Sequence, residues 1–422
     1  MKAAFDLVIV GAGPAGLAAA RAAASSGMRI ALVDDNPRAG GQVWRQGPDT
    51  GMPLVMHETL TDLIRNPNVT HYAGTRVSMF SGEHEMVVAT ACASGFVLSF
   101  GQLILATGAR ERLLPFPGWT LPGVTGAGAL QALIKGGMPV QGERVVLAGS
   151  GPLLIAALAT ARAAGARVVA VLEQTPWRSL LRFGVSLGAT PSKALQAIQL
   201  TQGFATTRYW PGSVVREALG SERVEAVVVR RGGRETTLAC DRLACGYGLV
   251  PNVSLAQALG CGLSDGAIEV DDAQRTSIPG IWAAGECTGI GGMELARAEG
   301  EIAGLAASGR PIGLPLLRTR AKWKRFAQRV ATAFELGDLA LTHPSAETIF
   351  CRCEDVTYGE VAAHGNWRDA KLHTRCGMGP CQGRICGAAA QTYFGWNAAT
   401  SRPPFAPTPI GALMDAALAQ EP

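Results

Sequence analysis

Short apolar runs of strand length recur along the chain, and several are followed at once by glycine-rich turns. The first run, at residues 5–10, leads into a turn that contains Gly11 and Gly13 and then into an alanine-rich segment. A second run, at residues 29–34, ends in a carboxylate. Continuous apolar runs that alternate with helical segments are typical of a parallel sheet covered on both faces. The pattern therefore predicts an α/β fold built from strand–helix–strand units.

The first turn has the spacing Gly-x-Gly-x-x-Gly over residues 11–16. The first glycine permits a tight turn, the second lets the backbone approach a pyrophosphate, and the third lets the helix pack closely on the sheet. The N-terminus of the helix then faces the phosphates. An acidic residue at the end of the next strand can accept a hydrogen bond from a ribose hydroxyl. This arrangement predicts a dinucleotide site made of Gly11, Gly13, Pro14, Ala15, Gly16 and Asp34.

The same order of strand, turn, helix and strand recurs over residues 145–173, with Gly149 and Gly151 in the turn and Glu173 at the strand end. Leu154 stands where the third glycine would be, which alters helix packing and with it the pose of a dinucleotide. No basic residue follows Glu173 immediately, which argues against the 2′-phosphate of NADP. Two interpretations stay open. Either NAD or another adenine nucleotide binds here, or the fold is vestigial.

The composition is typical of a multidomain globular protein. The 422 residues are enough for two or three cores, and 48% hydrophobic residues with 53 glycines suit nucleotide-binding units. The net charge of +5 is too small to indicate nucleic-acid binding. The strand at residues 5–10 leaves no room for a signal sequence, and Arg162 interrupts the longest apolar run before about 20 residues. We therefore expect a cytoplasmic chain with no transmembrane segment and no nucleic-acid partner.

Five cysteines lie close together near the C-terminus, at positions 351, 353, 376, 381 and 386. Thiols of a cytoplasmic chain stay reduced, so a group of them favours metal ligation over disulfides. Four thiolates suit either an iron–sulfur cluster or structural zinc, because soft sulfur ligands favour both. The chain has no CxxC pair, which disfavours a dithiol mechanism. No acid–base or nucleophile constellation indicates a catalytic residue outside the cofactor sites.

The segment before the cysteines has a helical pattern. Apolar side chains recur at helical spacing over residues 316–336, and basic side chains surround them. The basic face is interpreted either as a solvated linker or as a surface for an acidic partner or anionic lipid. His343 and Pro344 mark a turn, where we place a domain boundary.

Residues 103–110 and 280–287 resemble the two further FAD signatures of the glutathione- and thioredoxin-reductase-like flavoproteins. Residues 40–44 resemble the loop that lies along FAD in the same group, and residues 241–252 resemble its return strand. The resemblance implies FAD at the first site. It also implies that Glu286, where the group usually has aspartate, meets the ribityl-pyrophosphate region. The cofactor residues implied in these segments are Gly41, Gln42, Thr107, Gly108, Gly285 and Glu286.

The cysteine segment resembles the [2Fe–2S] domain related to bacterioferritin-associated ferredoxin, and its second half resembles a segment of anaerobic glycerol-3-phosphate dehydrogenase. This resemblance implies Cys351, Cys353, Cys381 and Cys386 as the cluster ligands. It leaves Cys376 as the spare thiol, with a cluster that uses Cys376 and Cys381 as the alternative.

Over nearly its whole length the chain is similar to the α subunit of heteromeric, flavin-dependent amino- and imino-acid dehydrogenases, which include D-hydroxyproline dehydrogenase, octopine and nopaline oxidases and hydrogen cyanide synthase. The resemblance implies an electron-transferring subunit that takes electrons from an amino-acid-oxidase-like β subunit and passes them to a respiratory acceptor. A small γ subunit and a peripheral position at the inner membrane are further options. The alternatives are a stand-alone NADH-dependent reductase of a ferredoxin or quinone, and a zinc-stapled interaction module.

The predicted fold class is thus α/β, with two Rossmann-like dinucleotide-binding domains and a small, mainly helical C-terminal [2Fe–2S] domain. The expected FAD-binding domain is discontinuous, over residues 1–115 and 247–315, and the second nucleotide-binding domain covers residues 116–246. The division continues with a linker helix at residues 316–342. It ends with a cysteine domain and its tail at residues 343–422.

Overall fold

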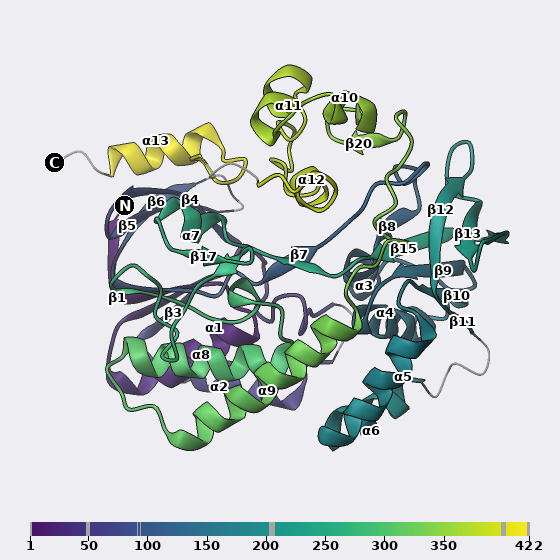
Figure 1. The fold of residues 1–422 in the computed structure, drawn as a ribbon. Coiled ribbons are helices and arrows are strands. Elements are labelled where there is room, and N and C mark those ends of the chain that lie inside the picture. The colour runs from purple at the N-terminus through teal and green to yellow at the C-terminus, as the bar shows by residue number, and fades with distance from the viewer. Residues whose placement is uncertain are drawn as a thin grey trace. The chain divides into compact units, whose positions relative to one another are not determined.

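The computed structural model describes residues 2–47, 51–90, 92, 94–201, 207–397 and 402–419. The chain divides into two compact units (Figure 1). The first contains residues 1–110, 250–327 and 400–422, and the second contains residues 111–249 and 328–399. The chain therefore leaves the first unit after residue 110 and re-enters it at residue 250, and again at residue 400.

The first unit is built on a seven-stranded sheet in the order β3-β2-β1-β6-β5-β4, with β19 paired to β6. Its strands are β1 (Lys2–Val10), β2 (Ile30–Val33), β3 (Val69–Tyr72), β4 (Thr75–Gly82), β5 (Glu85–Thr90), β6 (Gly95–Leu105) and β19 (Ile281–Ala283). β1 is parallel to both β2 and β6, and β19 is parallel to β6. The carboxyl ends of these four strands therefore meet at one edge of the sheet, where a ligand of such a fold binds.

Two helices of the first unit pack against each other without intervening large side chains. They are α1 (Pro14–Ala23) and α8 (Met293–Ala307), which lie side by side in Figure 1. A Cβ atom on Gly300 would lie 2.1 Å from the carbonyl oxygen of Ala15, and one on Gly304 would lie 2.3 Å from that of Ala19. Only glycine permits this approach, so these two positions set the spacing of α1 and α8.

Further helices and strands complete the first unit. They are α2 (Leu54–Arg65), α7 (Ser254–Ala258), the pair β17 (Leu263–Ser264) and β18 (Ala267–Ile268), and α13 (Ile410–Leu418). The helix α9 (Leu314–Ala333) begins in the first unit and ends in the second. The sequence pattern predicted this helix over residues 316–336, so the observed helix ends three residues earlier.

The second unit has a five-stranded parallel sheet in the order β11-β10-β9-β15-β8. Its strands are β8 (Val124–Gly126), β9 (Arg144–Gly149), β10 (Arg167–Glu173), β11 (Arg208–Pro211) and β15 (Arg242–Gly246). An antiparallel sheet contains β12 (Ser213–Leu219), β13 (Ala226–Arg231) and β14 (Arg234–Ala239). The helices are α3 (Ala127–Lys135), α4 (Pro152–Ala163), α5 (Trp177–Ser186) and α6 (Pro191–Thr201). The strands β7 (Ala109–Glu111) and β16 (Leu249–Pro251) pair where the chain crosses between units.

The cysteine-bearing segment belongs to the second unit and has its own small core. Its elements are the hairpin β20 (Ile349–Cys351) and β21 (Val356–Thr357), followed by α10 (Tyr358–Ala362), α11 (Trp367–Thr374) and α12 (Cys386–Phe394). The side chains of Phe350 and Val361 are fully buried in this core, and Trp367 is nearly so. A capping box between Thr357 and Glu360 begins α10.

The C-terminal tail differs from the predicted division, which placed residues 343–422 in one domain. The helix α13 instead lies on β5 and β6 of the first unit. The backbone nitrogen of Gly95 donates a hydrogen bond to Asp415 at 3.2 Å, and Ala416 packs against Val87 and Val97. The physical reason is that these two strands present an apolar face which the small apolar side of α13 covers.

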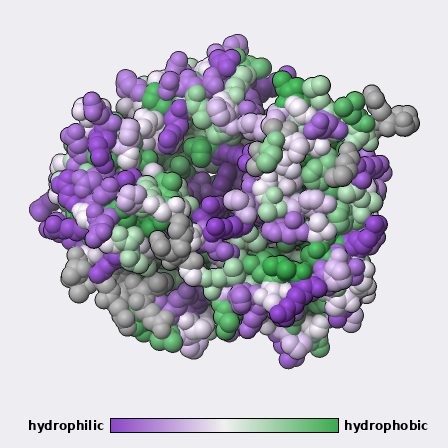
Figure 2. All heavy atoms as spheres, turned by 180° about the vertical axis from the view of Figure 1, so that it is seen from behind, coloured by the Kyte–Doolittle hydropathy of each residue, from purple (hydrophilic) through white to green (hydrophobic). Residues whose placement is uncertain are grey.

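Among the residues that the structure describes, no helix combines the length and the apolar composition that a membrane span requires. Figure 2 shows hydrophilic side chains distributed among hydrophobic ones over the face opposite to that of Figure 1.

Candidate functional site

The three glycines of the first turn have different structural roles. Gly11 has a φ of +109°, and a Cβ atom there would lie 2.2 Å from the carbonyl oxygen of Ala106. A Cβ atom on Gly16 would lie 1.7 Å from the carbonyl oxygen of Gly11. Gly13, at the N-cap of α1, differs because its Cβ atom would meet only the Cα of Gly41, at 3.9 Å. The open face of Gly13 is therefore the place where a pyrophosphate can reach the backbone.

The carboxylate of Asp34 braces this turn. Its Oδ2 accepts a hydrogen bond from the backbone nitrogen of Ala12 at 2.5 Å. Its Oδ1 accepts from the backbone nitrogen of Asn36 at 2.7 Å and from the side-chain nitrogen of Asn36 at 2.8 Å. The residue is 6% exposed. Asp34 thus connects the end of β2 to the glycine turn, and its contact with a ribose stays a prediction.

The loop after β2 lies against the same turn. The backbone nitrogen of Gly40 donates a hydrogen bond to the carbonyl oxygen of Ala12 at 2.8 Å. Gly41 has a φ of +59°, and a Cβ atom there would lie 3.0 Å from the Cα of Gly13. The side chain of Gln42 accepts a hydrogen bond from Arg45 at 3.0 Å. The structure therefore places Gly41 against the glycine turn, and a role for Gly41 and Gln42 in cofactor binding stays a prediction.

At the end of β6, Thr107 and Gly108 are tied to a residue that sequence reasoning had not assigned to the site. The hydroxyl of Thr107 donates to the carbonyl oxygen of Asn252 at 2.6 Å, and the side-chain nitrogen of Asn252 donates to the carbonyl oxygen of Thr107 at 2.9 Å. The backbone nitrogen of Asn252 donates to the carbonyl oxygen of Gly108 at 2.9 Å. The only local signal for Asn252 is an amide side chain directly after a strand end.

The turn after β19 contains a carboxylate oxygen that lacks a partner. Oε1 of Glu286 accepts a hydrogen bond from the backbone nitrogen of Gly292 at 2.7 Å. Its Oε2 is buried and has no hydrogen-bond partner within the described part of the chain. Burial raises the pKa of Glu286 above its ordinary value, although backbone hydrogen bonds oppose the shift. A buried acceptor of this kind fits a ligand that brings a donor such as a hydroxyl.

This turn lies against the N-terminal end of α1. Gly285 has a φ of +82°, and a Cβ atom there would lie 2.7 Å from the Cβ of Ala15. The turn that bears Glu286 therefore lies next to the glycine turn before α1, at the carboxyl edge of the sheet. These residues fit the phosphate and hydroxyl groups of a dinucleotide.

A buried ion pair that sequence reasoning missed supports the same turn. Glu299 and Arg320 are 5% and 8% exposed, and the distance between Glu299 Oε1 and Arg320 Nε is 3.9 Å. Arg320 also donates to Asp272 at 2.8 Å. Burial raises the pKa of Glu299, while the hydrogen bond from Gly285 and the charge of Arg320 oppose the shift. The sequence pattern grouped Arg320 with the other basic residues of its helix, because nothing local distinguishes it from them.

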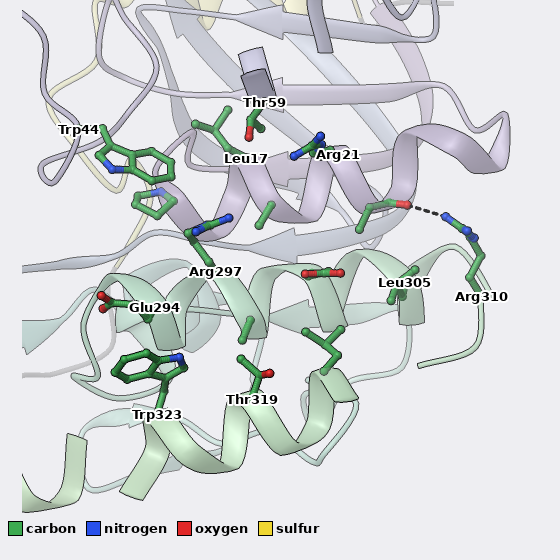
Figure 3. A pocket seen from close by; sticks show the side chains of 16 residues that line it. Leu17, Arg21, Trp44, Thr59, Glu294, Arg297, Leu305, Arg310, Thr319 and Trp323 are labelled. Carbon is green, nitrogen blue, oxygen red and sulfur yellow. Dashed lines mark hydrogen bonds between the residues drawn. The ribbon is translucent and has the colours of Figure 1, made fainter. Parts of the chain in front are cut away.

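A cavity of about 510 Å³ is lined by residues of α1, α8 and α9 (Figure 3). Trp44 and Trp323 line it, and Arg297 points from α8 toward α1. Arg310 donates a hydrogen bond to the carbonyl oxygen of Ala22 at 3.1 Å at the far end of α1. The sequence did not predict this cavity, because its walls come from helices separated by more than 200 positions in the chain.

The second glycine turn is also braced by the carboxylate that ends the next strand. Gly149 has a φ of +139°, and a Cβ atom there would lie 1.9 Å from the carbonyl oxygen of Gly246. Glu173 accepts hydrogen bonds from the backbone nitrogens of Gly151 and Thr175, both at 2.9 Å, and is 1% exposed. Burial raises the pKa of Glu173 above its ordinary value, although the hydrogen bonds to the carboxylate act to lower it. Leu154, the residue in place of the third glycine, lies fully buried in the core beneath the sheet.

Three of the five clustered cysteines form one buried group. The sulfur atoms of Cys351, Cys376 and Cys386 all lie within 4.8 Å of one another. The backbone nitrogen of Gly377 donates a hydrogen bond to the sulfur of Cys351 at 3.5 Å. The thiols of Cys376 and Cys386 are hydrogen-bonded to Cys351 and lower its pKa to about 2, against the effect of burial. This group has the donor chemistry of a soft-metal or iron–sulfur site.

The other two cysteines lie together at the edge of this group. Cys353 is exposed and Cys381 is half-buried, and the two thiols interact with each other. A Cβ atom on Gly379 would lie 2.4 Å from the Cβ of Cys353, so the loop passes Cys353 closely. The predicted ligands Cys351, Cys353, Cys381 and Cys386 are thus divided between the two groups, and Cys376 joins the buried one. The ligand set stays a prediction, and Cys376 is the residue that distinguishes the two assignments.

Comparison with known proteins adds relatives of similar length. The family described as pyridine nucleotide-disulphide oxidoreductase matches residues 5–301. An opine oxidase subunit of Agrobacterium tumefaciens (strain Ach5) is 34% identical over 425 residues, which cover 91% of this chain and 84% of the relative. Hydrogen cyanide synthase subunit HcnB of Pseudomonas aeruginosa is 34% identical over 427 residues, which cover 90% of each chain. The crystal structure of L-proline dehydrogenase from P. horikoshii shares the fold, with a TM-score of 0.67 and 19% identity over 98% of this chain and 80% of that one.

Proposed function

Because the chain belongs to the pyridine nucleotide-disulphide oxidoreductase family and is therefore an oxidoreductase, we propose that it is the electron-transferring subunit of a heteromeric flavin-dependent dehydrogenase. The donors proposed for the complex are amino or imino acids, with D-hydroxyproline or an opine as the first candidates. The observation that carries the proposal is the presence in one chain of an open dinucleotide turn and a group of buried thiols.

The names of the relatives support a complex. The relatives from opine oxidase and hydrogen cyanide synthase are both named as subunits, and each aligns with nearly all of this chain. We therefore propose a partner subunit, of amino-acid-oxidase type, that oxidises the C–N bond of the substrate, and a small γ subunit as a further candidate. On this proposal the present chain takes electrons from the partner and delivers them to a respiratory acceptor, in the cytoplasm at the inner membrane.

The first site is proposed to hold FAD. The N-terminus of α1 and the bare face of Gly13 would receive the pyrophosphate, because the backbone there is open and carries the positive end of the helix dipole. The unpaired oxygen of Glu286 would accept a hydrogen bond from a hydroxyl of the cofactor. When bound, a flavin supplies hydride and single-electron chemistry, and the protein contributes orientation and electrostatics. The chain residues proposed at this site are Gly11, Gly13, Pro14, Ala15, Gly16, Asp34, Gly41, Gln42, Thr107, Gly108, Gly285 and Glu286.

The cysteine segment is proposed to hold a [2Fe–2S] cluster, with Cys351, Cys353, Cys381 and Cys386 as ligands. Such a cluster supplies one-electron exchange at a potential that hydrogen bonds to the sulfurs help to set. The hydrogen bond from Gly377 to the sulfur of Cys351 is of this kind. On this proposal the chain would exchange electrons with a flavin and, through the cluster, with a one-electron acceptor.

A second candidate function is a stand-alone NADH-dependent reductase of a ferredoxin or quinone. The second glycine turn, with Gly149, Gly151 and Glu173, favours it, because the same order of elements binds dinucleotides in many α/β proteins. The two candidates differ in the source of electrons, which is a partner subunit in the first and NADH in the second.

Anaerobic purification of the native complex tests the proposal. We expect flavin absorption bands with a broad visible shoulder, together with iron, labile sulfide and a co-purifying flavoprotein subunit. Oxidation of D-hydroxyproline, proline, opines or glycine by the complex, but not by the isolated chain, would identify the donor. If the complex contains zinc and no iron or sulfide, the cysteine segment is an interaction module without a redox role. Rapid bleaching of the flavin of the isolated chain by NADH alone would favour the stand-alone reductase.

A further inference from the structure

We infer that a segment of the chain itself covers the second dinucleotide-type turn and blocks it to a nucleotide. The covering segment consists of residues 334–337. It follows directly after α9 and lies on the glycine turn between β9 and α4. All the contacts that support this inference lie within the second unit. The inference goes beyond the proposed function and does not depend on it.

The two glycine turns of the chain provide an internal comparison. The second glycine of this motif is bare so that a pyrophosphate can approach the backbone. A Cβ atom on Gly151 would lie 3.6 Å from Cγ and 3.9 Å from Cδ1 of the ring of Phe334. At the first site, a Cβ atom on Gly13 would meet only the Cα of Gly41, at 3.9 Å. The same face of the same motif is therefore open in the first unit and covered by an aromatic ring in the second.

Buried hydrogen bonds hold the segment on the turn. The hydroxyl of Ser150, inside the glycine motif, donates to the carbonyl oxygen of Phe334 at 3.0 Å. The side-chain nitrogen of Gln174 donates to the carbonyl oxygen of Glu335 at 2.9 Å and to Ser150 at 3.1 Å. Its side-chain oxygen accepts from the backbone nitrogen of Gly337 at 3.1 Å. Ser150 and Gln174 are 4% and 3% exposed, so their polar atoms are satisfied by this segment in place of solvent or a ligand.

Gln174 lies at the position where the motif would recognise a nucleotide. It directly follows Glu173, the acidic residue at the end of β10, and this end of the strand is the ribose side of a dinucleotide site. Both carboxylate oxygens of Glu173 already accept hydrogen bonds from the backbone of Gly151 and Thr175. Both oxygens of Asp34 accept the matching hydrogen bonds at the first turn. The difference between the two turns therefore lies in Gln174 and Ser150, which bind the segment of residues 334–337.

Flanking contacts fix the segment on both sides. The rings of Phe334 and Phe183 pack edge to face with their centroids 5.1 Å apart. Before the segment, Arg329 donates to the carbonyl oxygen of Ser186 at 2.8 Å and to the hydroxyl of Thr190 at 2.6 Å. After it, Leu336 packs against the buried core of the second unit. A nucleotide could reach the turn only if Phe334 left this position. The observed affinity of the chain for a nucleotide would therefore be reduced in proportion to the fraction of molecules in which Phe334 has moved away.

Calorimetric titration of NADH into the purified full-length chain tests the inference. We expect no measurable binding up to about 1 mM for the unmodified chain. Phe334→Ala should bind NADH at least ~10-fold more tightly, because the substitution uncovers Gly151. Phe326→Ala is the matched control, since Phe326 is an aromatic residue of α9 that packs against Trp323. Equal and measurable binding by the unmodified chain and Phe334→Ala would overturn the inference, and so would no binding by either.

Hydrogen exchange locates the nucleotide in the same samples. In Phe334→Ala, NADH should protect the backbone amides of residues 150–154, while protection of residues 12–16 instead would place the nucleotide at the first site and overturn the inference. If Phe334→Ala does not fold, Gln174→Ala replaces it, because it removes the hydrogen bonds to Glu335 and Gly337 and leaves the ring itself intact. This variant should show faster exchange at residues 334–337 and a gain in NADH binding. Unchanged exchange and unchanged binding would again contradict the inference.

Discussion

The backbone nitrogen of Gly285 donates a hydrogen bond to Oε2 of Glu299 at 3.1 Å, and this carboxylate is 5% exposed. The same oxygen accepts from the hydroxyl of Thr288 at 3.1 Å. Glu299 therefore connects α8 to the turn that bears Glu286, the residue with the unpaired buried oxygen. The geometry of the turn at the proposed cofactor site thus depends on the carboxylate of Glu299. The charge of this carboxylate is balanced by Arg320, which lies on a third element, α9.

Substitution of Arg320 by leucine should strongly destabilise the first unit. The change leaves Glu299 buried without its cation, and loss of one partner of a buried ion pair costs about 3 kcal/mol or more. We expect a lower midpoint of urea unfolding and weaker retention of FAD. The matched control is Arg318→Leu, because Arg318 is exposed on the same helix and should change stability by no more than about 0.5 kcal/mol. Equal midpoints for the two variants would show that the buried pair contributes nothing specific.

Gly13→Leu should abolish FAD retention while leaving the protein folded. A side chain at this position meets no nearby chain atom except the Cα of Gly41, but it fills the space that a pyrophosphate needs. Gly11→Ala is the informative comparison. Its Cβ atom would lie 2.2 Å from the carbonyl oxygen of Ala106 at a φ of +109°, so this variant should lose stability. Flavin absorbance per mole of protein and thermal unfolding separate the two effects, and stoichiometric FAD in folded Gly13→Leu would contradict the site assignment.

The sequence predicted those parts of the fold whose determinants are local. The turn at Gly11 and the carboxylate Asp34, which ends the next strand, both follow from short patterns with a known steric reason. The covering of Gly151 by Phe334 could not be predicted in this way, because the two residues are separated by 183 positions and Phe334 fits an ordinary amphipathic helix pattern. Burial of Arg320 likewise depends on tertiary packing that no local pattern encodes.

Asp241→Asn should lower the melting temperature of the protein by about 2 °C near neutral pH, because it weakens the second unit. Asp241 accepts hydrogen bonds from the backbone nitrogen of Arg144 at 2.7 Å and from the guanidinium of Arg144 at 2.7 and 3.1 Å. The side-chain hydrogen bonds from Arg144 lower the pKa of Asp241 from 3.8 to about 2. The pair is partly exposed, so solvent screening keeps the effect small.

The sign of the pH dependence follows from the lowered pKa of Asp241. The native state holds the ionised form better than the unfolded state does, so the stabilisation is present above pH 3.8 and is lost as the pH falls toward about 2. The melting temperatures of the unmodified protein and Asp241→Asn should therefore converge at acidic pH. Glu222→Gln, at an exposed acidic residue nearby in the chain, serves as the control. A difference that stays constant down to pH ~2 would contradict the assigned role of the ion pair.

Ala416→Glu should detach α13 from the first unit and destabilise it by about 3 kcal/mol. Ala416 is 3% exposed and packs against Val87 and Val97, so a charge placed there is buried without a partner. Met414→Glu is the matched control, because Met414 is 60% exposed on the same helix. Thermal unfolding of the two variants tests the finding that the tail belongs to the first unit. Equal stability would restore the division in which residues 343–422 form a single domain.

Replacement of each clustered cysteine by serine decides the ligand set of the proposed [2Fe–2S] cluster. Each iron of such a cluster takes two protein ligands, so loss of one thiolate leaves an open position that water attacks. Serine at Cys351, Cys353, Cys381 or Cys386 should therefore remove iron and labile sulfide.

Cys376→Ser is the substitution that distinguishes the two assignments. On the proposed ligand set it should leave iron and labile sulfide intact, although the sulfur of Cys376 lies within 4.8 Å of those of Cys351 and Cys386. A fifth thiol in such a group would stabilise the loop by packing and hydrogen bonding, so Cys376→Ser should show only a lower melting temperature. If Cys376→Ser loses the cluster while Cys386→Ser keeps it, Cys376 is a ligand. The pairing would then be Cys376 with Cys381, and Cys386, at the start of α12, would serve only in the packing of the small core.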